Sequence, residues 1–341
     1  GTHWVTARAG RGQAESDPAS IKARRKAAWR RRPLILDDDG DLVYAQQTAR
    51  GSQAFLSLRM PDCRTAGVNS LAWCIMWGIA KKGKTPTRYW QTQKLGTSFQ
   101  ENMPDPTPVI AKFCREHEIE VLGSIRMNDC HDSFIPGGVT LWKKAHPEFL
   151  IDPGDVPRDK DKHPLGLYVI AQNWSHKEVR DRKFEIIEEV CQRYDIDGVN
   201  LNYIRHPVFF SRTMRGLPVT DQETEIMTAF MRRIRWLTEA TGARRGRPIL
   251  VSAIVPDNLR LARNVGLDVK TWIEQDLIDM VTPGLGYAPF SLPVKEFTDL
   301  AHEHGVKVYP CINRKAPQHV ADSAVSEGFH GVAANWYRDG A

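Results

Sequence analysis

The sequence predicts an α/β protein, a single-domain (β/α)8 TIM barrel, on three observations. Strand-like and helix-like segments alternate from residue 33 to residue 341. Several strand-like runs are apolar without interruption, which is typical of parallel strands buried on both faces. Eight such units over roughly 300 residues fit one barrel. We therefore expect a barrel catalytic domain over residues 33–341, preceded by a basic arm or helix over residues 1–32.

Eight segments are expected to be strands, because apolar runs there end in turn residues. In chain order they are Pro33–Leu36, Val68–Trp77, Ile119–Met127, Asp197–Pro207, Ile249–Val255, Leu277–Thr282, Val306–Ile312 and Gly331–Asn335. The fourth is the most informative, because apolar and polar side chains alternate before the strand-breaking Pro207. We expect it to bring polar groups to the C-terminal end of the barrel, where the chemistry of such barrels takes place.

The helices expected between these strands have recognisable starts and ends. They cover Val109–His117, residues 175–194, residues 220–242, Val269–Gln275, Leu292–His304 and Gln318–Glu327. Ser175 with Glu178, and Thr220 with Glu223, are spaced as capping boxes, and Gly242 suits a C-cap. A long irregular loop follows the third strand over residues 129–165. Because no helix follows the last expected strand, we expect a helix near residues 19–31 to cover that gap.

A doubly wound open sheet is the competing fold. It would place a glycine-rich phosphate-binding turn after the first strand. The chain has three acids there, Asp37–Asp39, before Gly40, which is the wrong chemistry for a phosphate. This favours the barrel.

The net charge of +6 belongs to the N-terminal segment. Residues 1–32 hold nine Lys and Arg against Glu15 and Asp17, so that segment is +7 and the remainder is about −1. Such an arm could bind nucleic acid, but a solvated helix face is the favoured interpretation, so no nucleic-acid partner is expected. No run of about 18 apolar residues occurs, and no basic-then-apolar leader begins at Gly1, so no membrane partner is expected. The oligomeric state is left open.

The six cysteines are Cys63, Cys74, Cys114, Cys130, Cys191 and Cys311, and no two of them form a CxxC pair. This pattern predicts scattered buried thiols rather than a disulfide framework or a zinc site. No metal and no cofactor are expected.

Polar and aromatic side chains gather near the ends of the expected strands. They are Asp38, Trp73, Trp77, Arg126, Asn128, Asp129, His131, Asp132, Trp174, Asn200, Asn202, Arg205, His206, Ser252, Asp257, Tyr287, Asn313, Arg314 and Trp336. Aromatic faces with amide, carboxylate and guanidinium groups between them suit a sugar ring, whose C–H faces stack and whose hydroxyls form hydrogen bonds. Alternatives stay open: Asp129, His131 and Asp132 would suit a metal, and Asn200 with Asn202 would also suit a polar layer inside a barrel.

At Asp197–Pro207 the sequence resembles a group of bacterial glycoside-hydrolase-like TIM barrels, the "glycosyl hydrolase family 10-like" group. These relate loosely to the α-galactosidase and α-amylase type barrels. Their fourth strand typically reads Asp-Gly-(Leu/Ile)-(Glu/His)-Leu-Asp-(Phe/Tyr)-x-Arg-(His/Tyr)-Pro. The matching residues are Asp197, Gly198, Leu201, Tyr203, Arg205, His206 and Pro207, and the likeness extends through most of residues 31–336. The resemblance implies a glycosidase that works outside the cytoplasm, in the extracellular or periplasmic space.

One departure from that pattern concerns catalysis. Asn202 stands where these relatives carry the Asp expected to be the nucleophile or charge stabiliser, and an amide cannot form a glycosyl ester. The substitution is either engineered to inactivate the enzyme, natural with catalysis resting on another acid, or the mark of a protein that binds sugar without cleaving it.

The leading hypothesis is a glycoside hydrolase acting on a poly- or oligosaccharide. Asp129 or His131 would transfer the proton, and Asn202 would mark the second catalytic position. Cations expected near the rim, Arg126, Arg205, His206 and Arg314, favour a sulfated or carboxylated glycan. The alternatives are a carbohydrate-binding pseudoenzyme and a metal-dependent hydrolase on the same fold.

Overall fold

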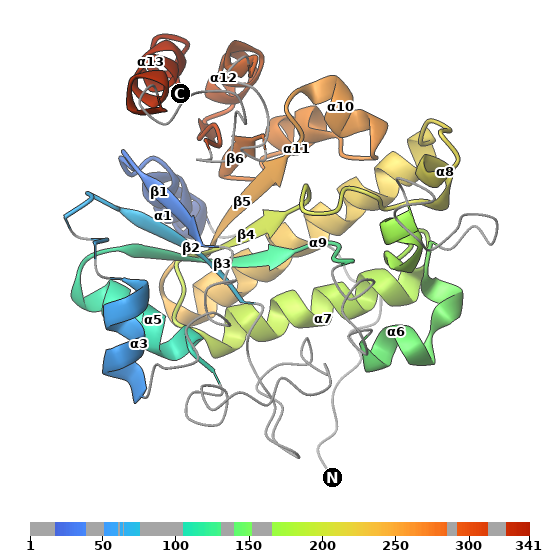
Figure 1. The fold of residues 1–341 in the computed structure, drawn as a ribbon, viewed down its shortest axis with the longest axis horizontal. Helices are drawn as coiled ribbons and strands as arrows, with labels where there is room; N and C mark the ends of the chain where they lie inside the picture. Colours follow the sequence, from blue (N-terminus) through green and yellow to red (C-terminus); the bar gives the residue numbers. More distant parts are fainter. Residues whose placement is uncertain are drawn as a thin grey trace.

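The computed structural model describes residues 18–38, 51–60, 62–63, 65–75, 105–130, 140–151, 166–284, 292–312 and 325–341. Within them, seven parallel strands form one curled sheet in the order β1 to β7, with helices on its outer side (Figure 1). The strands are β1 (Ile35–Asp38), β2 (Ser70–Cys74), β3 (Glu120–Arg126), β4 (Gly198–Asn202), β5 (Leu250–Val255), β6 (Met280–Pro283) and β7 (Lys307–Val308). The expected parallel α/β architecture is therefore confirmed through its first seven strands.

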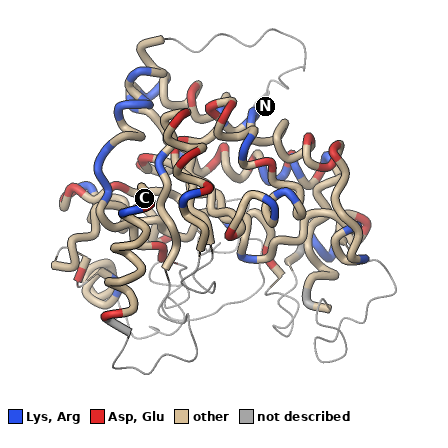
Figure 2. Tube along the Cα trace, turned by 90° about the horizontal axis from the view of Figure 1, so that it is seen from above, with Lys and Arg blue, Asp and Glu red and all other residues tan. Residues whose placement is uncertain are grey.

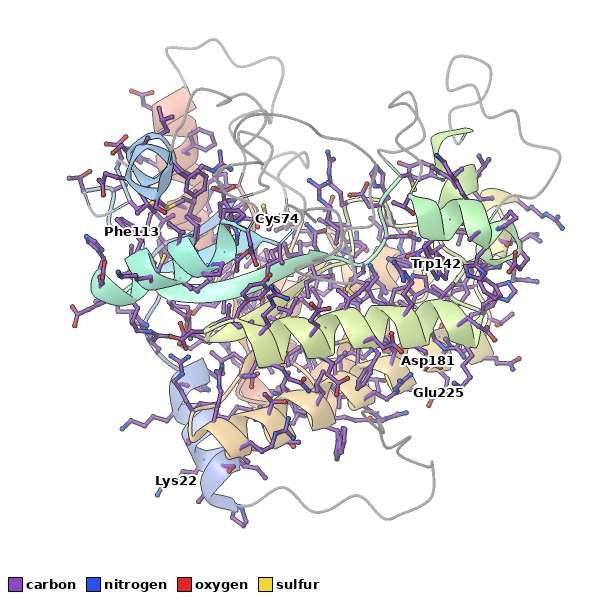
Figure 3. The ribbon with its side chains drawn as sticks, turned by 90° about the horizontal axis from the view of Figure 1, so that it is seen from below. Lys22, Cys74, Phe113, Trp142, Asp181 and Glu225 are labelled. Carbon is purple, nitrogen blue, oxygen red and sulfur yellow. The ribbon has the colours of Figure 1, made fainter. Side chains whose placement is uncertain are left out.

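The helices cover the convex side of the sheet and its ends. They are α1 (Pro18–Ala28), α3 (Gly51–Arg59), α5 (Thr107–Glu116), α6 (Leu141–Ala145), α7 (Lys177–Arg193), α8 (Ser211–Met214), α9 (Asp221–Arg245), α10 (Leu259–Asn264), α11 (Val269–Glu274), α12 (Val294–Glu303) and α13 (Val325–Arg338), with 3-10 turns η2 (Pro147–Phe149) and η3 (Gly166–Ile170). In Figure 1 the arrows of β3 and β4 point toward the side that carries α6 and α8, so these lie beyond the C-terminal ends of the strands. The long helices α7 and α9 run side by side, joined by an ion pair from Arg233 Nη1 to Asp181 Oδ1 at 2.9 Å (Figure 3).

Alternation along each strand divides the core into two parts. Trp73, Leu201 and Tyr203 point outward into a large apolar cluster with the helices, and all three are fully buried. Ala72, Leu122, Leu250 and Met280 belong to a separate small cluster. Because successive residues of a strand face opposite sides of the sheet, this second cluster lies on the concave side.

Two of the expected helix boundaries differ from the structure. The capping box of Thr220 and Glu223 is confirmed, but α9 runs past Gly242 and ends at Gly246, whose φ of 69° is left-handed. Gly242 lies inside the helix, where the absence of a side chain lets the chain after α9 pass close by: a Cβ there would be 3.2 Å from the Arg247 carbonyl oxygen. The expected capping box of Ser175 and Glu178 is wrong. Ser175 Oγ donates to Asn173 Oδ1 at 2.8 Å, and the N-cap residue of α7 is His176, whose side chain caps no backbone N–H.

Helix α1 lies at the N-terminal ends of the strands. Arg24 forms ion pairs with Asp279, just before β6, and with Asp276. Ala28 packs among inward-facing residues of β2, β3, β5 and β6. The expectation that this helix covers a gap beside the last strand is therefore wrong, and its buried arginines are structural rather than solvated.

The expected eighth strand, Gly331–Asn335, is also wrong, because these residues lie within α13. Val332 and Trp336 are four residues apart and both buried, which is the spacing of one helix face. Residues 318–324 of the expected preceding helix lie outside the described residues.

The position of Gly331 in α13 makes a stability prediction. A Cβ at Gly331 meets nothing within 4 Å, so only backbone preference should matter. We expect Gly331→Ala to raise the unfolding free energy by about 0.5–1 kcal/mol, and Gly331→Val to raise it less, because β-branched residues are poorer helix formers. Urea denaturation of the two variants measures this. The opposite order, Val above Ala, is what a strand would give and would contradict the helix.

Other expectations concern cysteines, charge and membranes. All six cysteines are free thiols, and five of them are buried, as predicted. Lys and Arg are interspersed with Asp and Glu over the described chain seen from above (Figure 2). No helix among the described residues is long and apolar enough to span a bilayer.

Candidate active site

A cavity of about 810 Å³ lies within the curl of the sheet. Its lining from the strands comprises Ile35, Leu36, Asp37, Ala72, Leu122, Asn200, Asn202, Ser252, Ile254, Thr282, Lys307 and Val308. Trp336 and Tyr337 of α13 also line it. A cavity of this size is in the range that holds small-molecule ligands.

The polar side chains inside the cavity come from neighbouring strands at matching heights. Asn200 pairs in register with Ser124 on β3 and with Ser252 on β5. Asn200 Nδ2 lies 3.3 Å from Ser124 Oγ, to which it donates. Asn202, two residues further along β4, lines the cavity nearer its C-terminal mouth. The two asparagines thus share the concave face, as their spacing predicted.

Strand β1 presents Asp37, not Asp38, to the cavity. Asp38 pairs in register with Trp73, an outward-facing residue, and forms a buried ion pair with Arg59 of α3. Asp37 lines the cavity and is exposed to solvent within it. The predicted binding residue Asp38 therefore lies on the outer side of the sheet, and its neighbour occupies the position expected of it.

The ends of β3 and β4 lie together, as predicted from the sequence. Arg126 is the register partner of Asn202, and Met127 N donates to the Asn202 carbonyl at 2.9 Å. Arg126 Nη1 donates to Asp129 Oδ2 at 2.8 Å, and only 1% of the Arg126 surface is exposed. This charge-assisted hydrogen bond holds the Asp129 carboxylate beside the end of β3.

His206 closes this cluster. Its Nδ1 accepts the backbone N–H of Cys130 at 3.1 Å and lies 3.7 Å from Asp129 Oδ1. His206 is buried, and its hydrogen bond with Cys130 joins the loop after β3 to the loop after β4.

Asn202 and Arg205 line the mouth of the cavity. Asn202 Oδ1 accepts the backbone N–H groups of Ile204 at 3.2 Å and Arg205 at 3.0 Å. This arrangement is an Asx-type turn, which ends the strand and directs the chain into the next loop. The side chain of Asn202 therefore has a structural task besides its position in the cavity.

Asn128 is buried and bonded at both ends of its carboxamide. Its Nδ2 donates to the carbonyls of Gln172 at 3.0 Å and Val208 at 2.7 Å, and its Oδ1 accepts Gln172 N at 3.0 Å. The residue predicted to bind substrate thus ties three segments together.

Asn128→Asp should lower the unfolding free energy by about 2 kcal/mol, because a carboxylate cannot donate to two buried carbonyls. Asn258→Asp is the matched control: Asn258 Oδ1 only accepts, from Leu261 N, at the N-cap of α10, where Asp caps equally well. Thermal and urea denaturation compare the pair. Equal losses at both positions would contradict the donor role of Asn128.

The predicted aromatic residues separate into two groups. Trp73 and Trp174 are fully buried; Trp73 Nε1 donates to Thr107 Oγ1 at 3.3 Å, and Trp174 packs edge-on against Phe230. Trp336 lines the cavity from α13. Six other predicted site residues lie outside the described part of the chain: Trp77, His131, Asp132, Tyr287, Asn313 and Arg314.

A second carboxyl group stands near the cavity. Burial raises the pKa of Asp257, which follows β5, above its usual range. Burial, and then the carboxylates of Asp37 and Asp257, raise the pKa of the Cys311 thiol to about 12. Cys311 lines the cavity beside Asp37. Both acids follow expected strands in the sequence, but nothing in the sequence distinguished them from other strand-end acids.

A metal site is not formed by the described residues, among which no three His, Cys, Asp or Glu side chains converge. The metal hypothesis rests on His131 and Asp132, which lie outside them.

Comparison with known proteins gives structural likenesses only. No family model and no curated protein matches the sequence. Among solved structures, a maltogenic α-amylase from Thermotoga neapolitana is 12% identical, with 86% of this chain and 62% of that chain covered and a TM-score of 0.43. An α-L-fucosidase from Paenibacillus thiaminolyticus is 13% identical, with coverage of 89% and 49% and a TM-score of 0.43.

A family 18 N-acetylglucosaminidase from Paenibacillus barengoltzii is 12% identical, with coverage of 75% and 54% and a TM-score of 0.37. This chain thus spans about half to three-fifths of the length of these three structures. All three are glycoside hydrolases by name.

Proposed function

We propose that this protein is a glycoside hydrolase that binds an oligo- or polysaccharide in the cavity of the curled sheet. The observation that supports this most is the set of groups lining the mouth of that cavity: the carboxylate of Asp37, the carboxamide of Asn202, the guanidinium of Arg205 and the hydroxyl of Thr282. They come from β1, from β4 and the loop that follows it, and from β6, and they line one cavity at the C-terminal end of the sheet. Sugar hydroxyls take such donors and acceptors in pairs, and barrel active sites occupy that end.

Hydrolysis of a glycosidic bond needs a proton donor and a second group across the sugar ring. Asp257 suits the donor, because its raised pKa keeps a proton available closer to neutral pH. Asp37 suits the second group, since it lines the cavity with a solvent-exposed carboxylate. Asp129 and His131 stay candidates from the sequence. Asn202 supplies no charge and would position the substrate.

The cavity favours an anionic sugar. Its charged lining residues are Arg30, Arg31, Arg32, Asp37, Arg205 and Lys307. Arg205 follows β4 at the mouth of the cavity, whereas Arg30, Arg32 and Lys307 lie at the N-terminal ends of the strands, where Arg32 is paired with Glu120. Arginine binds planar oxyanions with two hydrogen bonds, which suits carboxylate and sulfate groups.

The test is release of reducing sugar from a panel of neutral, sulfated and uronic-acid-containing oligosaccharides. We expect turnover by the unchanged chain on an anionic member of the panel, and its loss in Asp257→Asn and Asp37→Asn. Asp299→Asn is the matched control, because Asp299 lies on α12 in a solvent-exposed pair with Lys295. Turnover that persists in both the Asp37 and the Asp257 variants would refute these roles. No turnover by any variant, Asn202→Asp included, would refute the hydrolase.

A carbohydrate-binding pseudoenzyme is the second candidate, and the hydrogen bonds of Asn202 favour it. An amide whose oxygen accepts two backbone N–H groups is built into the loop that it ends. Calorimetric titration with the same oligosaccharides separates the two candidates. Binding without turnover, unchanged in Asn202→Asp, is the result that a pseudoenzyme predicts.

A further inference from the structure

The cavity of the curled sheet also reaches the N-terminal ends of the strands, opposite its mouth. The part at this end, here named the N-terminal hollow, is lined by Arg30, Arg31, His302, Lys307 and Tyr337. These residues belong to segments 18–38, 292–312 and 325–341, each of which is described without a gap. Strands of five to six residues put this end about 15–20 Å from the mouth.

The cations of the N-terminal hollow lack carboxylate partners among the described residues. Arg30 Nη2 donates to the neutral carbonyl of Glu118, just before β3, at 3.1 Å. Arg31 is exposed, and neither Arg31 nor Lys307 forms an ion pair within the described part of the chain. The carboxylate of Glu120 is already occupied by Arg32, which donates to both of its oxygens at 2.6 Å. The hollow therefore carries net positive charge.

Lys307 is held in place by an uncharged neighbour. Its Nζ lies 3.7 Å from the centre of the Trp29 ring, and Trp29 Nε1 donates to the Gly305 carbonyl at 2.8 Å. An aromatic face stabilises an ammonium group without neutralising it. Burial, and then the nearby cation of Arg32, lower the pKa of Lys307 below its usual range. A partly buried cation kept close to another cation is typical of sites that take up a negative charge.

His302 of α12 lies within the electrostatic field of the same ammonium group. Burial, and then Lys307, lower the pKa of its imidazole, partly offset by Asp299. Asp299 is itself paired with Lys295 on the exposed side of α12. An anion bound beside Lys307 would cancel this repulsion and so raise the pKa of His302. The imidazole therefore reports whether the hollow is occupied.

We propose that the N-terminal hollow binds a phosphate or sulfate group through Arg31 and Lys307. Arginine gives such an oxyanion two parallel N–H donors, and lysine adds a compact positive charge. Of the described cations lining the cavity, only Arg205 stands at the mouth, so this site is separate from the proposed sugar site. It does not depend on hydrolase activity.

The test is calorimetric titration of the full chain with sulfate and with inorganic phosphate. Lys307→Met and Arg31→Gln each remove one cation from the hollow and should weaken binding of both ions by about 10-fold. Arg25→Gln is the matched control, because it removes the same charge from α1, but Arg25 pairs with Asp276 and does not line the cavity. Arg205→Gln tests whether the ion binds at the mouth instead.

Arg25→Gln and Arg205→Gln should keep the affinity of the unchanged chain. No binding by the unchanged chain, an equal loss in Arg25→Gln, or a loss confined to Arg205→Gln would overturn the proposal. NMR titration of His302 gives an independent readout: saturating sulfate should raise its pKa, and raise it less in Lys307→Met. A pKa of His302 that ignores sulfate would overturn the proposal as well. Neither readout involves sugar turnover, so failure here is distinct from failure of the proposed function.

Two further titrations identify what carries the oxyanion. Tyr337 is 63% exposed, and its hydroxyl donates to the Pro33 carbonyl at 3.4 Å, which holds the ring beside the hollow. Glucose 6-phosphate and glucose 6-sulfate are compared with the inorganic ions. Tighter binding of the sugar esters, lost in Tyr337→Ala, supports a site for an esterified sugar whose ring contacts the tyrosine. Equal or weaker binding of the esters supports a site for the free oxyanion.

Discussion

Replacing Asp279 by asparagine is expected to lower the unfolding free energy by about 3–5 kcal/mol. Asp279 is 2% exposed and accepts from Arg24 and, at 3.0 Å, from Arg235. Its Oδ2 also accepts the backbone N–H of Val251 at 2.7 Å. An amide of the same shape keeps the volume but leaves two buried guanidinium groups without this carboxylate. The loss should loosen α1 from the N-terminal end of the sheet.

The matched control for this change is Asp299→Asn. Asp299 pairs with Lys295 at 2.5 Å, but their side chains are 62% and 69% exposed. Solvent-exposed pairs of this kind contribute about 1 kcal/mol or less. Urea denaturation of the two variants measures both effects. A loss at Asp279 no greater than that at Asp299 would mean that the buried network contributes no more than a surface pair.

The ion pairs of α1 also mark a limit of prediction from sequence. The cluster of basic residues in residues 1–32 was interpreted as a solvated helix face. Arg24 instead reaches Asp276 and Asp279, more than 250 positions away in the chain, and Arg32 binds Glu120 at 2.6 Å. Charge patterning along a segment gives no information about partners that only the fold brings near.

The first seven strands were predictable because a parallel strand buried on both faces is an apolar run bounded by turn residues. The same property makes the last element ambiguous. The short apolar run around Val332 and Ala333 fits a buried strand or a helix equally well. In α13, Val332 and Trp336 are both buried and four residues apart, which is the spacing of a helix rather than a strand. This spacing is visible in the sequence only over a window longer than the apolar run itself.

The proximity of polar residues after the third and fourth strands was predictable, and their role as a binding or catalytic site stays a prediction. Polar residues after the third and fourth strands do converge: Arg126, Asn202 and His206 belong to one cluster. The orientation of side chains on β1 and β2 was not predictable, since all five residues of β2 are buried and adjacent acids end β1, so hydropathy cannot separate the two faces. A shift of one position distinguishes Asp37, inside the cavity, from Asp38, which binds Arg59 outside it.

Lys183 on α7 is expected to make stability depend on pH above neutrality. Its Nζ donates to the Arg126 carbonyl at 3.0 Å behind the cluster after β3, and the residue is buried. Burial, and then Arg182, lower its pKa from 10.5 to about 7, partly offset by Asp129. In the unfolded chain the amine holds its proton up to about pH 10, whereas the folded protein releases it near pH 7. The unfolded state therefore binds more protons between these limits, so stability rises with pH across that window.

Each unit of pKa difference corresponds to about 1.4 kcal/mol, so the rise from pH 7 to pH 10 should be on the order of 4 kcal/mol. Below pH 7 both states hold the proton, and the contribution of Lys183 no longer changes. Lys183→Met removes the titrating group, so its unfolding free energy relative to the unchanged chain should be highest near pH 7 and fall toward pH 10. Lys112→Met, at a Lys on α5 whose side chain is 77% exposed, is the control and should leave the profile parallel to that of the unchanged chain. Urea denaturation at intervals of one pH unit measures the unfolding free energy of all three proteins. Parallel dependence of this free energy on pH in all three would show that Lys183 keeps an ordinary pKa in the folded state.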